Sequence, residues 1–205
     1  MANPAIRRLC IAVALHQAHD RDGALGRLPE FGALLRSACR DSPLDRALWR
    51  RQPHCNGELA FLPPGIDEGY VIGYFLREAA RALSEHNRSA DGDSRARLEI
   101  AFHQGLTYIT DSGYIGPAVT VVCGLLSSQQ LMQALTNNQD ADLAIAVSRQ
   151  IFEEIILQAG DGLMAQGFSS VEIQGPDGAR LPAWIRAASH DRLFNFGIDI
   201  CERSG

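Results

Sequence analysis

The chain has 205 residues, of which 46% are hydrophobic and 21% are charged, and its formal net charge at pH 7 is −5. This length and apolar content predict one domain, spanning residues 1–205, with its own buried core. The negative net charge gives no broad basic field for gripping a phosphate backbone, so we expect no nucleic-acid partner.

The cysteine pattern and the hydropathy of the sequence predict the cellular compartment. Five cysteines, an odd number with no CxxC pair, encode neither a disulfide framework nor a zinc ribbon, which favours a reducing, cytoplasmic location. The start of the chain imitates a signal peptide, but its apolar run at 9–15 is short, and we interpret it as a core strand. No later stretch approaches the ~20 apolar residues of a spanning helix, so we expect no membrane partner.

Strand and helix patterns alternate in the first half of the chain. The predicted order is a buried strand at 9–15, a helix at 31–39, strands at 47–53 and 58–62, and a long helix from Asp67 to about Asn87. The Asn-Gly pair at 56–57 predicts a hairpin between the two strands, and Asp67 is a typical helix cap.

The second half continues the alternation. A half-buried strand at 98–103 is followed past Gly105 by a second or bent strand at 106–110, and a helix at 118–126 resumes at 131–135. A buried strand at 143–147, a helix capped by Ser148, and a hairpin with Val171 and Ile173 on one strand and Trp184 and Ile185 on the other complete it. The elements together predict an α/β (α+β) fold.

Local groups of reactive side chains are candidates for chemistry, but each has an ordinary structural explanation. His16 and His19 could share a metal ion only if their segment were helical, and the acidic pairs Asp91/Asp93 and Glu153/Glu154 are typical of solvated surfaces. Neighbouring side chains on a turn, such as those of His54 and Cys55, point apart. Two enzymatic alternatives nevertheless stay open, one using His16, His19 and Asp20 and the other using His54 and Cys55.

Three strings resemble segments of the class III nucleotide cyclase catalytic domain, the adenylate and guanylate cyclase family. Residues 55–61 (CNGELAF) resemble its Gly-Asp-Gly hairpin, 116–125 (GPAVTVVCGL) resemble its glycine-to-helix segment, and 144–152 match a later strand and helix. The resemblance spans roughly residues 7–160. It implies a ferredoxin-like, mostly antiparallel central sheet flanked by helices.

The resemblance also implies where a metal centre would lie. In the family, two aspartates hold two metal ions against the triphosphate, and these positions fall on Ala14 and Asn56. Alanine cannot ligate a metal, and asparagine offers only a neutral carbonyl oxygen to a hard divalent ion. We therefore expect no metal ion and no cofactor.

The remaining functional positions of the family are also changed. A base-reading lysine falls on Gln52, and the helix asparagine and arginine, which orient the ribose and stabilise the transition state, fall on Thr120 and Gly124. These five positions predict a catalytically degenerate cyclase-like protein with no catalytic residues, acting by binding a protein partner, itself or a nucleotide-like ligand. The family builds its sites between two copies, which favours a homodimer. An active, divergent nucleotide cyclase is the alternative.

Overall fold

One β-sheet organises the part of the chain that the computed structural model describes, residues 4–16, 28–39, 48–54, 57–89, 95–159, 164–175 and 178–189. Its elements in chain order are β1 (Ile6–Leu15), α2 (Leu28–Ala38), β2 (Arg50–His54), β3 (Gly57–Phe61), α3 (Glu68–Ser89), β4 (Leu98–Thr110), β5 (Gly113–Ile115), α4 (Pro117–Leu126), α5 (Gln129–Thr136), β6 (Leu143–Ser148), α6 (Arg149–Ile151), the π-helix η3 (Phe152–Ile156), β7 (Ser169–Gln174) and β8 (Arg180–Ala188).

The sheet has the strand order β2-β3-β1-β4-β6-β8-β7, and β5 pairs with the far end of β4. Only the pairing of β4 with β6 is parallel among these strands, and the others are antiparallel. The predicted mixed fold, with a mostly antiparallel sheet between helices, is confirmed. β1 lies between β3 and β4, which explains why its apolar run shows little alternation: both of its faces are covered.

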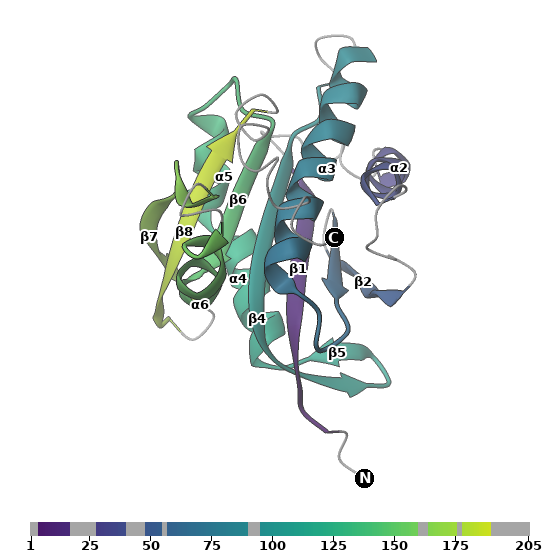
Figure 1. The fold of residues 1–205 in the computed structure, drawn as a ribbon, viewed down its shortest axis with the longest axis vertical. Coiled ribbons are helices and arrows are strands. Elements are labelled where there is room, and N and C mark those ends of the chain that lie inside the picture. The colour runs from purple at the N-terminus through teal and green to yellow at the C-terminus, as the bar shows by residue number, and fades with distance from the viewer. Residues whose placement is uncertain are drawn as a thin grey trace, which may run out of the picture.

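Helices cover both faces of the sheet (Figure 1). One face packs large side chains from β1, such as Leu9, Ile11 and Val13, against α2, α3 and the segment that contains η3. The opposite face, which we call the alanine-rich face, carries Ala12, Ala14, Ala101, Ala144 and Ala146 and lies under α4 and α5. Small side chains let these two helices approach the strands closely.

Two predicted features of the helices have different outcomes. The Asp67 carboxylate accepts a hydrogen bond from the Tyr70 backbone amide at 2.9 Å, so the predicted cap of α3 is confirmed. Ser148 is the N-cap residue of α6, as predicted, but its side chain makes no capping hydrogen bond to the helix. Its hydroxyl instead lies 2.9 Å from Nδ1 of His103, and the helix continues as the π-helix η3. Glu153 and Glu154 are both exposed there, as expected.

The strand predicted at 98–103 and the second or bent strand predicted at 106–110 are one strand, β4, which runs through Gly105 and has 13 residues. A Cβ at Gly105 would lie 3.1 Å from Cβ of Ala118, so the glycine makes room for the start of α4. The far end of β4 and β5 together carry four exposed apolar side chains, those of Leu106, Tyr108, Ile109 and Ile115.

The stretch Pro117–Thr136 is long and apolar enough to cross a membrane, with a mean hydropathy of 1.3, which differs from our expectation that no such stretch exists. It comprises two helices rather than one, because Ser128 caps α5 by accepting a hydrogen bond from the Leu131 backbone amide. Val122, Leu125, Leu131 and Leu135 are buried against the alanine-rich face. Packing of this kind is that of core helices in a globular domain.

Candidate functional site

The end of β1 lies beside the hairpin formed by β2 and β3. Ala14 pairs with Gly57 on β3 and with Glu99 on β4, and its side chain is only 3% exposed. A Cβ at Gly57 would lie 1.9 Å from the Val13 carbonyl oxygen, so only glycine permits this close approach of the strands. Asn56 and Cys55 lie outside the described residues. The position at Ala14 is therefore fixed by strand register, and it presents a methyl group to the alanine-rich face.

A buried histidine–carboxylate pair lies next to Ala14. Nδ1 of His16 is 2.7 Å from Oε1 of Glu99, and the two side chains are 2% and 12% exposed. Glu99 is directly opposite Ala14 across the sheet, so both side chains emerge on the same face. The other ring nitrogen of His16, Nε2, is buried and has no hydrogen-bond partner among the described residues. The carboxylate nearest to Ala14 is thus already engaged by an imidazole.

Arg97 holds the neighbouring backbone together. Its guanidinium donates hydrogen bonds to the carbonyl oxygens of Ala141, Leu135 and Asn138, at 2.8, 2.7 and 2.5 Å. Its own carbonyl oxygen accepts a hydrogen bond from the His16 backbone amide at 2.8 Å. Burial lowers the pKa of Arg97 from its ordinary value. The end of α5, the start of β4 and the end of β1 are therefore joined through one residue.

Gln52 has a structural use in this fold. Its Oε1 accepts a hydrogen bond from the Tyr114 backbone amide at 3.0 Å, and its Nε2 donates to the Tyr114 carbonyl oxygen at 3.4 Å. Oε1 would also lie 2.6 Å from a Cβ at Gly113, whose φ is +115°. The carboxamide therefore ties β2 to β5 and is already hydrogen-bonded at both of its polar ends.

Thr120 and Gly124 lie one turn apart on α4, on the side opposite its buried residues Ala118, Val122 and Leu125. Thr120 is exposed, and a Cβ at Gly124 would have no heavy atom within 4 Å. Because Ala14 lies under the other side of this helix, the structure does not bring these positions together with Ala14 within one chain.

The remaining candidates form no catalytic group in the described part of the chain. His54 ends β2 and is half-buried, whereas His19, Asp20, Asp91 and Asp93 lie outside the described residues. Sequence reasoning missed the pairing of His16 with Glu99 and that of His103 with Ser148, because 83 and 45 residues separate the partners. A histidine and a carboxylate in two separate strands gave no local signal.

The described residues do not fit a divalent metal ion. No group of three or more His, Cys, Asp or Glu side chains able to hold one occurs among them. Ala14 has no donor atom, and one oxygen of Glu99 is bonded to His16. A hard cation such as Mg²⁺ needs several oxygen ligands in near-octahedral geometry, and this end of the sheet does not supply them from its described side chains.

Solved structures with this arrangement are nucleotide cyclase domains. The guanylyl cyclase Cya2 matches with a TM-score of 0.60 and 14% sequence identity, covering 98% of this chain and 98% of its own. An adenylate/guanylate cyclase/hydrolase from Silicibacter pomeroyi gives 0.56 and 17%, covering 91% and 100%. The chain has the cyclase catalytic-domain fold. The guanylate cyclase domain of RhGC from Catenaria anguillulae, in complex with GTP, gives 0.52 and 7%, covering 89% and 96%.

No protein-family profile matches the sequence, and no curated protein does. The chain thus shares the cyclase fold with these structures at 7–17% sequence identity. The sequence resemblance assigns four described residues to functional positions of the family, and the structure divides them between the sheet with its hairpin (Ala14 and Gln52) and the outer side of α4 (Thr120 and Gly124).

Proposed function

We propose that this chain is a catalytically degenerate cyclase-fold domain that acts by binding, as a homodimer, rather than by forming a cyclic nucleotide. The observation that carries the proposal is the buried methyl group of Ala14 at the end of β1. The cyclase resemblance places a metal-binding aspartate there, and without it the attacking hydroxyl and the triphosphate lose the cation that would activate and neutralise them.

The outer side of α4 supports the same conclusion. The resemblance places a transition-state arginine at Gly124, and a residue without a side chain supplies no positive charge. The Gln52 carboxamide is hydrogen-bonded to the Tyr114 backbone, so it is not free to read a base. A partner copy contributing the same residues would not repair either half of a shared site.

Self-association is the binding event that the surface favours most. The resembled family builds its sites between two copies, and four apolar side chains are exposed on the end of β4 and on β5. Residues 112–139, which include α4 and α5, contain no Asp, Glu, Lys or Arg. A surface depleted of charge and bearing exposed apolar groups is typical of an isologous interface.

A cytoplasmic location is part of the proposal. It is supported by the cysteine pattern of the sequence, five residues with no CxxC pair, which is typical of a reducing compartment.

The test is product analysis with a gain-of-function control. The purified protein is incubated with ATP or GTP and with Mg²⁺ or Mn²⁺, and cyclic nucleotides are measured by mass spectrometry. The control variant restores the family's residues through Ala14→Asp, Gln52→Lys, Asn56→Asp, Thr120→Asn and Gly124→Arg. No product from the native protein, with product from the control, is the expected result.

Metal-dependent cyclic product from the native protein contradicts the proposal, as does any other nucleotide turnover that His54→Ala abolishes. Gly124→Arg alone serves as a folding control, because the position has open space around it. Sedimentation velocity at micromolar concentration tests the dimer, and a monomer alone contradicts that part.

A further inference from the structure

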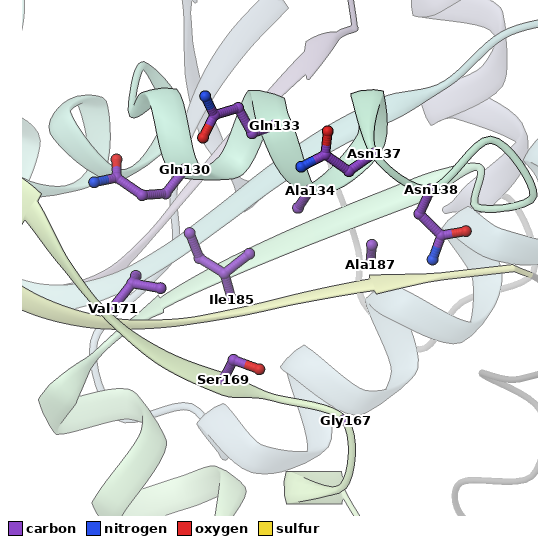
Figure 2. A pocket seen from close by; sticks show the side chains of 10 residues that line it. All are labelled: Gln130, Gln133, Ala134, Asn137, Asn138, Gly167, Ser169, Val171, Ile185 and Ala187. Carbon is purple, nitrogen blue, oxygen red and sulfur yellow. The ribbon is translucent and has the colours of Figure 1, made fainter.

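A groove of about 410 Å³ lies between α5 and the strands β7 and β8. Figure 2 shows α5 along one side of it, with Val171 and Ile185 pointing from the strands toward the helix. The groove opens on the alanine-rich face, and none of its lining residues is one of the cyclase-site positions described above. Its volume falls in the range of small-molecule sites.

The helix presents amides to the groove at regular spacing. Gln130, Gln133, Ala134 and Asn137 recur three and four residues apart, which places them on one side of α5. The side of α5 that packs on the sheet is apolar, through Leu131 and Leu135. The run 129–139 also contains six carboxamide side chains and no charged one. Gln133 and Asn137 are exposed and Gln130 is half-buried, so this side of the helix offers amide groups at the mouth of the groove.

The carboxamides keep free hydrogen-bonding capacity. The side chains of Gln133, Asn137 and Asn138 and the hydroxyl of Ser169 make no hydrogen bond to another described residue. Gln130 is the exception, since its Nε2 donates to the Glu172 carbonyl oxygen at 2.9 Å and links α5 to β7. Each free carboxamide offers both a donor and an acceptor.

The rest of the lining is aliphatic and uncharged. Ala134, Val171, Ile185 and Ala187 supply apolar surface, and none of the ten described residues that line the groove carries a charge. Arg186 would lie 3.3 Å from a Cβ at Gly167, but it lies between Ile185 and Ala187 in β8 and so points to the other face of the sheet. An anionic or cationic ligand would therefore find no counter-charge among these residues.

We propose that this groove binds a neutral planar heterocycle with amide-type edges, that is, a nucleobase or an uncharged nucleoside. Aliphatic side chains cover the flat face of such a ring, and Asn or Gln side chains match the donor and acceptor groups along its edge. The site is separate from the degenerate cyclase position, so the inference does not depend on whether catalysis has been lost. A phosphate on the ligand adds no affinity here.

The test is an NMR titration of the isotope-labelled full chain with adenosine, guanosine, cytidine and uridine, and with glucose and galactose as a comparison. Saturable shifts in residues 130–138, 167–171 and 185–187 are expected for at least one nucleoside, with a Kd of about 1 mM or tighter. The corresponding monophosphate is expected to bind no tighter.

A matched pair of variants on the same helix assigns the binding. Gln133→Met, which keeps the size but removes the hydrogen bonds, is expected to weaken binding about fivefold or more. Gln129→Met changes an exposed glutamine that does not line the groove and is expected to have no effect. Ala134→Leu, which fills the groove, is a second disruptive variant if Gln133→Met does not fold. The proposal is overturned if no nucleoside binds, if only the sugars bind, or if both glutamine variants weaken binding equally.

Discussion

Replacing His16 with leucine is expected to destabilise the fold by about 3 kcal/mol, because it leaves the Glu99 carboxylate buried without its hydrogen-bond partner. Removing one member of a buried pair costs about 3–5 kcal/mol in general. The 12% exposure of Glu99 lets it recover some hydration, which places the estimate at the lower end of that range.

Replacing both His16 and Glu99 with leucine distinguishes the cost of an unpaired buried carboxylate from a loss of packing. The double variant His16→Leu/Glu99→Leu removes the carboxylate together with the imidazole, so it is expected to lie within about 1 kcal/mol of the native protein. Stability is measured as the urea midpoint and slope for the native protein, both single variants and the double variant. His54→Leu, at a half-buried position that ends a strand, is the control and should cost less than about 1 kcal/mol.

Additive free energies would contradict mutual stabilisation of the pair. If the double variant loses the sum of the two single losses, His16 and Glu99 do not stabilise each other.

Three further predictions concern glycines and titrating groups. Gly57→Ala should destabilise by about 3 kcal/mol or more in urea, whereas Gly124→Ala should stabilise by about 0.5–1 kcal/mol, because only the first added Cβ meets backbone atoms. Burial, with a contribution from Arg7, lowers the pKa of His103 from 6.5 to about 4. Its stabilising contribution is complete above pH 6.5 and is lost as the pH falls toward 4, so His103→Gln should flatten the decline of the urea midpoint over that window. Burial raises the pKa of Cys10 to about 12, so an aromatic disulfide reagent at pH 8 should label this thiol only after unfolding.

Each of these three predictions has a result that would contradict it. Equal stability of the two glycine variants would contradict the close approach of β1 and β3. An unchanged pH profile in His103→Gln would contradict a neutral, buried imidazole, and rapid labelling of Cys10 in the native protein would contradict its burial.

Local patterns were sufficient to predict most elements of the fold. The apolar run of β1, the Asp67 cap of α3 and the alternation of Val171 and Ile173 in β7 each report on a few consecutive residues, and each is confirmed. The parallel pairing of β4 with β6 and the position of β1 between β3 and β4 depend on contacts between distant segments, which no local period encodes.

For the candidate site, too, the sequence indicated single positions but not the contacts between them. A resemblance of short strings pointed to Ala14, Gln52, Thr120 and Gly124, and strand register now places Ala14 beside the hairpin. The same strings said nothing of what surrounds Ala14. Glu99 was expected only as a polar position in a half-buried strand, and its engagement with His16 required the pairing of β1 with β4.

Arg97 links segments that are far apart in the sequence through its side-chain and backbone hydrogen bonds. Arg97 joins Leu135 in the last turn of α5, and Asn138, which follows the helix and borders the groove, to the start of β4, two residues before Glu99. Any displacement of that turn must carry the first residues of β4 with it or rupture several short contacts at once. An Arg97→Lys substitution, which lacks the forked guanidinium, would therefore weaken the link between the end of α5 and the start of β4.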